Sequence, residues 1–311
     1  MDSRLAALAG RQGGAFSAAE AVARGVPEAE LPRAVATGEL VRVRRGAYVH
    51  RRQWDAADLA GRFRLECLAV ARTRRGDALS HHAALSLHGL PLWSYDPRRI
   101  DLVANVAQGV VRGGLHLHPG GRRTFLVDGL LVVPVAEAVV RTAVTMGFEC
   151  AVVAGDAALH ARLVTEEELR TEVARVSPHQ GRKRAQAAVD RMDPAAESVG
   201  ESRTRMVLQN LGMRYESQKV LCDDHGRFLA RVDFLVEGVV LEFDGRIKYQ
   251  RDGDVDGADA AEVVWREKQR EDVIRRQGHA VERVIWPELD RPGLIGARIR
   301  AARRPALQHT E

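Results

Sequence analysis

The stretch Arg231-Val-Asp-Phe-Leu-Val-Glu-Gly-Val-Val-Leu-Glu-Phe-Asp-Gly245 decides the fold of the C-terminal part of the chain. Two runs of alternating apolar residues flank Glu237 and Gly238, which is the pattern of a β-hairpin with a two-residue loop. In that register Val236 pairs with Val239. The stretch therefore predicts two antiparallel strands inside a larger sheet.

This register gathers three carboxylates on one face of the sheet. Counting outward from the loop places Asp233 directly opposite Glu242, and strand alternation adds Asp244 to the same face. The apolar side chains are expected to fill the opposite face: Val232, Phe234, Val236, Val239, Leu241 and Phe243.

Opposed carboxylates need neutralisation. Directly opposed Cβ atoms lie about 5 Å apart, so like charges there destabilise a sheet unless a cation or a raised pKa relieves them. Carboxylate oxygens suit Mg²⁺ or Mn²⁺, which activate water and neutralise phosphoryl charge during phosphodiester cleavage. Glu201 faces the sheet from a helix expected within residues 194–212. We therefore expect Asp233, Glu242 and Glu201 to bind the metal, with Glu197 as the alternative to Glu201.

The order of a helix with Glu201, a strand with Asp233 and a hairpin partner with Glu242, then a long helix and a strand, resembles the PD-(D/E)XK nuclease superfamily. Within it, Glu242-Phe-Asp-Gly-Arg-Ile-Lys-Tyr249 and Trp265-Arg-Glu-Lys-Gln-Arg-Glu-Asp272 resemble the very-short-patch-repair-like branch. The resemblance implies a restriction-endonuclease-like domain of three layers, α/β/α, that hydrolyses DNA with a metal ion.

The sequence departs from that superfamily at one position, where Asp244 replaces the usual lysine two residues after Glu242. Asp244 is then a further candidate catalytic residue. Lys248 has the strand parity of Glu242 and is the preferred cation for stabilising the transition state, with Lys268 on the next helix as the alternative. Two hypotheses stay open: an active metal-dependent endonuclease, and an inactive nuclease fold retained as a DNA clamp or partner surface.

Residues 1–55 have the pattern of three short helices followed by a basic hairpin, which is typical of a winged helix. Ser17 and Glu20 form a capping-box pattern, and Pro27 fits the first turn of the third helix. In residues 40–49 apolar side chains alternate with arginines. The predicted contacts to double-stranded DNA are Arg33 on the third helix and Arg42, Arg44 and Arg45 on the hairpin. The alternative is a solvated basic hairpin without a partner.

The segments Gly13-Gly-Ala-Phe-Ser17 and Leu40-Val-Arg-Val-Arg-Arg-Gly-Ala-Tyr48 resemble the N-terminal domain of AbiEi-type antitoxins of type IV toxin–antitoxin systems. Leu79-Ser-His-His-Ala-Ala-Leu-Ser-Leu-His-Gly-Leu-Pro91 resembles the second region of that family. The resemblance implies a DNA-binding transcriptional repressor with a cognate toxin or defence partner.

The whole chain is therefore expected to be a multidomain α/β protein. Asp193-Pro194 has the pattern of a helix cap followed by a first-turn proline and predicts the last boundary. The expected regions are a winged helix at 1–55, a mixed α+β region at 63–190, a nuclease-like domain at 193–300 and a tail at 301–311.

Composition limits the remaining functions. Hydrophobic residues make up 45% of the 311 residues, enough for real cores, but no run approaches the roughly 18 residues that a membrane span needs. Three widely spaced cysteines predict reduced thiols and a cytoplasmic protein. The net charge of +5 permits a nucleic-acid partner. A phosphate-binding loop motif is lacking, so no nucleotide cofactor is expected.

Two patterns that resemble metal sites receive no role. Asp252-Gly-Asp-Val-Asp-Gly257 matches half of an EF-hand loop but has Val263 at the twelfth position. The histidines have no further ligands at metal-binding spacing, so structural or surface roles are expected for His81, His82, His88, His116 and His118.

Overall fold

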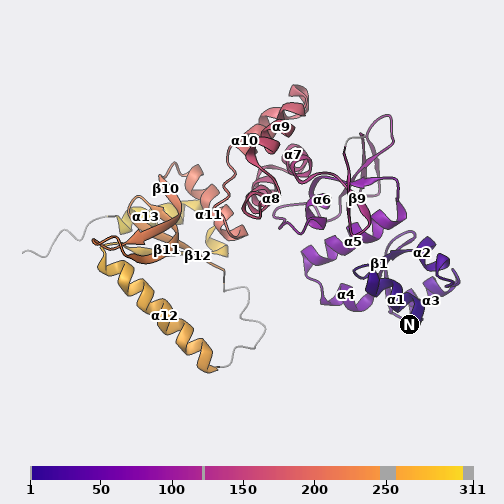
Figure 1. Cartoon of the computed structure of the whole chain (residues 1–311), viewed down its shortest axis with the longest axis horizontal. Coiled ribbons are helices and arrows are strands. Elements are labelled where there is room, and N and C mark those ends of the chain that lie inside the picture. Colours follow the sequence, from indigo (N-terminus) through magenta and orange to yellow (C-terminus); the bar gives the residue numbers. More distant parts are fainter. Residues whose placement is uncertain (1, 121–122, 246–256, 304–311) are drawn as a thin grey trace, which may run out of the picture. The chain divides into compact units, whose positions relative to one another are not determined.

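The computed structural model describes residues 2–120, 123–245 and 257–303. The chain forms two compact units, residues 1–192 with helices and two sheets, and residues 193–311 with helices and one sheet (Figure 1). The protein is therefore multidomain and α/β. Within the described ranges, no helix combines the length and apolar composition that crossing a bilayer requires.

The N-terminal segment of the first unit consists of short helices packed on a three-stranded sheet of order β1-β3-β2. Its core includes Leu5, Phe16, Leu31 and Leu40. The elements are α1 (Ser3–Arg11), β1 (Ala15–Ser17), α2 (Ala18–Ala23), α3 (Glu30–Ala36), β2 (Leu40–Arg44) and β3 (Ala47–His50).

The helices and the hairpin of this segment agree with the sequence pattern, with two differences. The capping box is confirmed, because Ser17 Oγ accepts a hydrogen bond from the Glu20 N–H and the Glu20 carboxylate accepts one from the Ser17 N–H. Strand β1 was not expected, since it is short and pairs with the distant β3. The third helix begins at Glu30 and not at Pro27, because the residues after Pro27 form a turn.

Helix α5 (Leu59–Thr73), which follows α4 (Arg51–Ala56), joins the N-terminal segment to the rest of the unit. It packs against β1 and β3 and also against α6 (His81–Leu87). At the edge of this contact, Arg72 Nη1 lies 3.6 Å from the Glu20 carboxylate, and both side chains are nearly buried. Removing either partner of a buried ion pair is costly, because the remaining charge is left without compensation.

The middle of the first unit is a six-stranded mixed sheet of order β6-β7-β5-β4-β9-β8. Strand β5 is buried along its whole length and pairs in parallel with β7, so its side chains meet residues far away in sequence. The strands are β4 (Ala78–Leu79), β5 (Ile100–Ala104), β6 (Val110–Arg112), β7 (Leu115–Pro119), β8 (Phe125–Val127) and β9 (Leu130–Val132).

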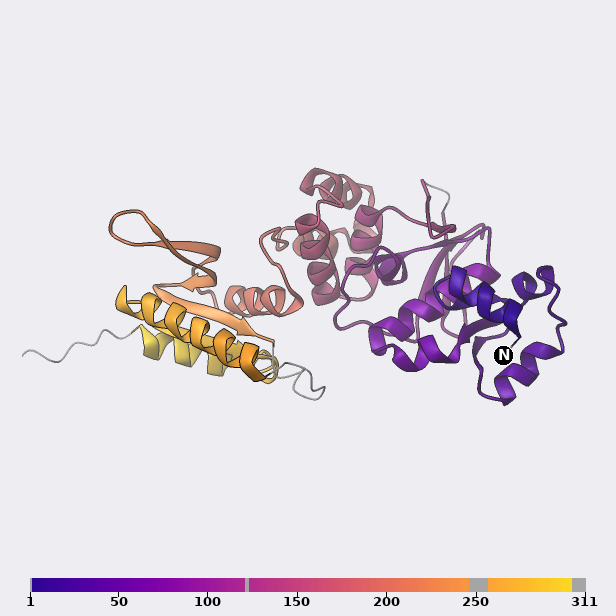
Figure 2. The ribbon, with the colours of Figure 1, turned by 60° about the horizontal axis from the view of Figure 1, so that its bottom comes forward.

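Helices cover this sheet and then form a bundle of their own (Figure 2). Helix α6 packs on β5 and on α7, and α7 packs on α8, α9 and α10. The bounds are α7 (Val135–Thr145), α8 (Phe148–His160), α9 (Glu166–Arg175) and α10 (Arg182–Val189), with the short helix η1 (Pro178–Gln180) before α10.

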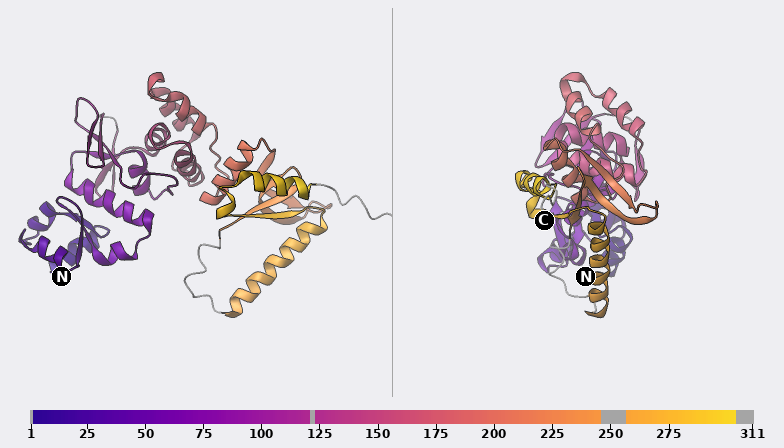
Figure 3. Two further views of the ribbon diagram at one scale, coloured as in Figure 1. Left: turned by 180° about the vertical axis from the view of Figure 1, so that it is seen from behind. Right: turned by 90° about the vertical axis from the view of Figure 1, so that its left-hand side faces the viewer.

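The second unit has a four-stranded sheet of order β10-β11-β12-β13, in which β12 and β13 are parallel and the other pairs are antiparallel. Helices α11 and α13 lie on one face of the sheet and α12 lies on the other (Figure 3). Ile274 of α12 packs on that second face. The elements are α11 (Val199–Asn210), β10 (Tyr215–Cys222), β11 (Phe228–Val236), β12 (Val239–Asp244), α12 (Gly257–Arg276), β13 (Val281–Ile285), η3 (Trp286–Glu288) and α13 (Pro292–Ala302).

The predicted hairpin register is confirmed, since Val236 pairs with Val239. Both loop residues, Glu237 and Gly238, have positive φ angles, as a two-residue loop of type I′ requires. One predicted side chain is on the wrong face: Val232 packs in the cluster that contains Ile274 of α12 and not in the cluster that contains Phe234.

A local irregularity accompanies this change of face. Pairing between β10 and β11 includes Ser217 with Phe234 and Lys219 with Val232, but the intervening Gln218 has a φ of +48° and is not paired with Asp233. Simple alternation assumes an undistorted strand, so it fails at Val232, next to this irregularity.

Gly200 allows α11 to lie close to β12. A Cβ atom placed on Gly200 would come within 1.9 Å of the Phe243 ring, which is also packed edge-on against Trp286. The missing side chain therefore brings the next residue, Glu201, to the sheet.

We predict that Gly200→Ala lowers the free energy of unfolding of the second unit by about 1–3 kcal/mol, because the methyl group displaces Phe243. This loss exceeds the helix-propensity gain of about 1 kcal/mol. Urea denaturation of the full chain measures it. Gly293→Ala is the matched control, since a Cβ atom there meets nothing within 4 Å. Equal stability of the two variants would contradict the close approach.

Candidate functional site

Asp233 is the centre of the predicted carboxylate group. Its Oδ2 accepts a hydrogen bond of 2.8 Å from the backbone N–H of Phe243, across the hairpin. Burial raises the pKa of Asp233 to about 6; the charges of Glu201 and Glu242 also raise it, while the Phe243 hydrogen bond and the charge of Arg270 oppose the shift. The two glutamates that the sequence grouped with Asp233 therefore both act on its carboxyl group.

Glu242 has a cationic partner from α12. Arg270 Nη2 lies 2.7 Å from Glu242 Oε1 and also donates a hydrogen bond to the backbone carbonyl of Arg231. The repulsion between opposed carboxylates is thus relieved in two ways: protonation of Asp233 becomes easier, and Arg270 neutralises Glu242. The sequence pattern gave no indication of Arg270.

Glu201 is nearly buried at the start of α11, where its carboxylate accepts three hydrogen bonds. The donors are the Glu197 N–H at 3.0 Å, the Ser198 hydroxyl at 2.7 Å and the Gln218 side-chain amide at 2.9 Å. Glu197, the alternative ligand, instead forms an ion pair of 2.9 Å with Arg231. The Glu201 carboxylate is therefore fixed in place by bonds within the unit.

Carboxylate oxygens are the right donors for Mg²⁺ or Mn²⁺. In the described part of the chain, however, Asp233, Glu242 and Glu201 are not gathered into a group whose ligand atoms all lie within 4.8 Å of one another. Asp244 pairs through its backbone with Ile285 on β13, and Lys268 is exposed. Lys248 and residues 252–256 of the EF-hand-like motif lie outside the described residues. The metal ligands stay a prediction.

The arginines predicted to contact DNA differ in their freedom. Arg42 and Arg45 on the β2–β3 hairpin are exposed. Arg33 is also exposed, but its guanidinium forms an ion pair of 2.7 Å with Glu30 on the same helix. The hairpin therefore presents the more available positive charge.

Arg44 is half-buried and packs inside the first unit. Its guanidinium lies against the turn between β6 and β7, where a Cβ atom on Gly114 would come within 2.9 Å of Arg44 Nη2 and 2.4 Å of the Arg98 carbonyl oxygen. Gly114 has a φ of +82° as well, so this turn requires glycine. Arg44 anchors the hairpin to the middle region.

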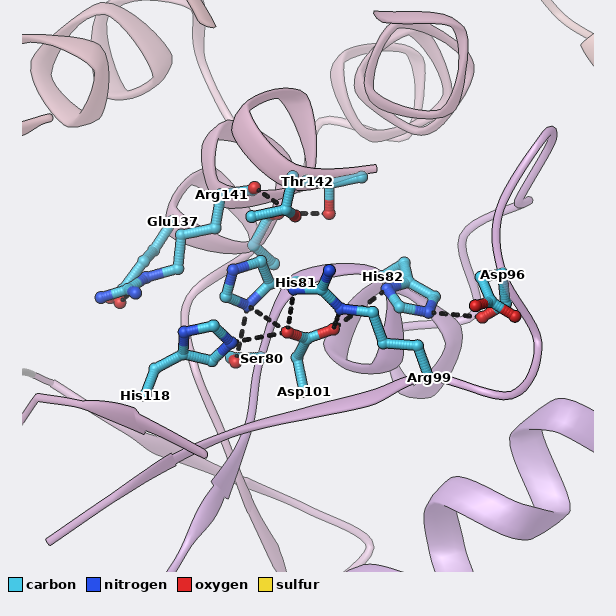
Figure 4. Close-up of polar contacts among 12 residues, drawn as sticks. Ser80, His81, His82, Asp96, Arg99, Asp101, His118, Glu137, Arg141 and Thr142 are labelled. Carbon is cyan, nitrogen blue, oxygen red and sulfur yellow. Dashed lines mark hydrogen bonds and ion pairs between the residues drawn. The ribbon is translucent and has the colours of Figure 1, made fainter. Parts of the chain in front are cut away.

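A second polar group, unexpected from the sequence, surrounds the fully buried Asp101 on β5 (Figure 4). Arg99 donates to its carboxylate from Nε at 2.8 Å and from Nη2 at 2.7 Å, and His118 Nε2 on β7 lies 2.6 Å from Oδ1. Burial acts to raise the pKa of Asp101, but the hydrogen bonds from His118 and Arg99 outweigh it and hold that pKa well below its usual range.

Two further histidines approach Asp101 from the start of α6. His81 Nδ1 lies 3.8 Å and His82 Nδ1 lies 3.6 Å from the carboxylate. His81 has a φ of +52°, and its ring stacks on His118 with centroids 4.4 Å apart. Burial lowers the pKa of both His81 and His82. Both rings are therefore harder to protonate than a solvent-exposed imidazole.

The histidines His81 and His118 line one side of a cavity of about 450 Å³. Helices α7 and α9 supply the other side, and their charges are paired internally, Arg141 with Glu137 at 2.7 Å and Arg175 with Glu172. The cavity thus combines two imidazoles with balanced charged pairs.

The sequence pattern predicts structural or surface roles for these histidines and gives no indication of Asp101. The sequence features that belong to this cluster are the run Ser80-His-His82 and the alternating His116 and His118. Their convergence depends on the parallel pairing of β5 with β7, which places Val103 beside His118 and which local patterns do not predict.

Residues 3–49 match the family described as "Transcriptional regulator, AbiEi antitoxin". This segment runs from α1 to β3 and includes all four predicted DNA-contact arginines. No match to a curated protein was found. The N-terminal part of the predicted resemblance is thereby supported, and the matched segment does not reach the carboxylate group of the second unit.

The raised pKa of Asp233 predicts a specific pH dependence. A carboxyl group whose pKa is higher in the folded state than its ordinary 3.8 stabilises the fold at low pH, and that contribution is lost as the pH rises toward about 6. Relative to Asp233→Asn, the wild type should lose up to about 3 kcal/mol of unfolding free energy between pH 4 and 6.5.

Urea denaturation at several pH values measures this difference. Asp272→Asn, at an exposed position on α12, is the control and should follow the wild type at each pH. A wild type and an Asp233→Asn variant with parallel pH profiles would show that Asp233 titrates normally.

Proposed function

We propose that the chain is a DNA-binding transcriptional regulator of the AbiEi antitoxin type, with residues 3–49 as its DNA-reading end. The observation that carries this proposal is the family match over that segment. The order of elements from α1 to β3, with a three-stranded antiparallel sheet at one side, is also the order of a winged helix. A cognate toxin or defence protein is the expected partner of such an antitoxin.

In this proposal the β2–β3 hairpin follows the phosphate backbone of double-stranded DNA, and α3 lies in the major groove. Arg42 and Arg45 are exposed and supply the backbone contacts. Arg33 contributes less, because it must give up its ion pair with Glu30. Arg44 contributes through the position of the hairpin, since it packs against the Gly114 turn.

We predict that Arg42→Glu/Arg45→Glu lowers affinity for double-stranded DNA more than about tenfold and reduces the slope of log affinity against log salt by about 2, because two phosphate contacts are lost. Fluorescence anisotropy at several salt concentrations measures both quantities, with DNA from upstream of the protein's own gene and a scrambled duplex as probes.

The control variant Arg123→Glu/Arg170→Glu makes the same change in net charge at exposed positions outside residues 3–49. Its affinity and salt slope should match those of the wild type. If both double variants weaken binding equally, overall charge and not the hairpin carries the interaction.

A second candidate function is metal-dependent DNA hydrolysis by residues 193–300, within a restriction-endonuclease-like α/β/α fold. It is favoured by the electrostatic coupling of Asp233 with Glu201 and Glu242 at the junction of α11 with β11 and β12. Mg²⁺ or Mn²⁺ held there would supply an activated water and charge neutralisation. The ion pair between Arg270 and Glu242 would have to break. Lys248 would supply the positive charge of the usual lysine, whose position Asp244 occupies. In the alternative, an inactive nuclease fold, Arg270 stays paired with Glu242.

For this second candidate we predict that supercoiled plasmid is nicked in the presence of Mn²⁺ and that Asp233→Ala and Glu242→Ala each abolish nicking. Gel electrophoresis measures cleavage, and Asp272→Ala is the control that should stay active. A wild type that binds DNA without nicking it under these conditions would leave the regulator as the function and the second unit as a clamp or partner surface.

A further inference from the structure

We propose that His81, Asp101 and His118 in the first unit form a metal-binding site of the Zn²⁺ class, separate from the carboxylates of the second unit. They are the one group of three or more His, Cys, Asp and Glu side chains in the described parts of the chain whose ligand atoms all lie within 4.8 Å of one another. Two imidazoles and one carboxylate, with a further position open, are a known ligand set for catalytic zinc.

The distances suit a tetrahedral ion. With metal–ligand bonds of about 2.0–2.1 Å, two donor atoms of a tetrahedral site lie about 3.3 Å apart. The separation from Asp101 Oδ1 is 2.6 Å to His118 Nε2 and 3.8 Å to His81 Nδ1, so the two values lie on either side of the required one. Sub-ångström movements of the two rings, with release of the His118 Nε2 proton to solvent, would replace the present hydrogen bond with coordination.

The surroundings hold the ligands in place. Asp101 keeps its orientation through two hydrogen bonds from Arg99. Second-shell contacts such as those from Arg99 orient the ligands of metal sites. Ser80 Oγ lies 2.8 Å from His81 Nδ1, and this hydrogen bond would be given up when the nitrogen binds the metal. His82 is also close to Asp101, but its ring stacks on Phe63 and it is not one of the three proposed ligands.

The fourth position of the site would open toward the cavity. His81 and His118 line that cavity, whereas Asp101 lies behind them and is fully buried. A water or an anionic group entering from the cavity would therefore meet the metal from the side of the imidazoles. Helix α7 faces this position with Glu137 and Arg141 (Figure 4).

Donor chemistry selects the metal class. Mg²⁺ and Ca²⁺ prefer sets made only of oxygen ligands, whereas two imidazole nitrogens favour zinc and similar transition metals. The ligands of this site share no residue with Asp233, Glu242 or Glu201, so loss of either site is not expected to remove the other.

The experiment is a titration of the untagged, chelator-treated full chain with Co²⁺, followed by visible absorption and then by displacement with Zn²⁺. Both metals are added to the Asp233→Ala/Glu242→Ala background, so that binding at the second unit does not contribute. We expect saturable Co²⁺ binding with a stoichiometry of about one per chain and an intense visible band typical of four-coordination, which Zn²⁺ removes.

In the same background, His118→Ala should weaken Co²⁺ binding by more than about tenfold, since loss of a mere second-shell partner already costs that much. The control is His116→Ala on the same strand, outside the ligand group, which should bind as tightly as its parent. His81→Asn is a second test, because asparagine tolerates the positive φ angle at that position.

Each outcome decides the proposal. Weakened binding in either His118→Ala or His81→Asn, with a retained circular dichroism spectrum and an unaffected His116→Ala, supports the site. Absence of saturable Co²⁺ binding, or equal affinity in His116→Ala, His118→Ala and His81→Asn, would overturn it and leave Asp101 as the centre of a structural network.

Discussion

A carboxylate removed from water must either find cationic and hydrogen-bonding partners or become protonated, and this constraint shapes both units of the chain. In the first unit the buried Asp101 is satisfied by Arg99 and His118, and its pKa is held low. Because Arg99 directly precedes β5 and His118 lies on the parallel strand β7, these contacts also fix how the two strands lie side by side. The sheet and the cluster of histidines around Asp101 therefore depend on one another.

In the second unit the same constraint is met differently. Asp233 has only a backbone donor, Phe243, as its direct hydrogen-bond partner among the described residues, and its pKa rises to about 6. The nearby Arg270 pairs with Glu242 instead. Two carboxylates at neighbouring positions on paired strands thus end up in different states, one close to protonation and the other tied to a cation. Such a division is typical of sites that titrate or exchange partners, and a fully satisfied ion-pair network would lack it.

How much of this the sequence predicts depends on the range of the interactions. The hairpin loop at Glu237-Gly238 and the capping box at Ser17 are determined by neighbouring residues, and both are confirmed. Side-chain alternation also places most of the apolar hairpin residues correctly, and it fails at Val232, beside the distortion at Gln218. The Asp101 cluster and the pairing of Arg270 with Glu242 rest on contacts between distant elements, which no local pattern encodes. For that reason the sequence predicts helices and strands well and predicts the contacts between them poorly.

The segment that matches the antitoxin family and the unit that folds around it have different boundaries. The match ends at residue 49, yet α5 packs against β1 and β3, and Arg72 of α5 pairs with Glu20 in a nearly buried position. The same helix carries Phe63, whose ring stacks on His82 beside Asp101 at a centroid distance of 5.1 Å. Helix α5 therefore packs both on the core of the segment that matches the antitoxin family and on the histidine cluster. Since one rigid helix contributes to both, the orientation of the β2–β3 hairpin and the packing around Asp101 are parts of one folded unit.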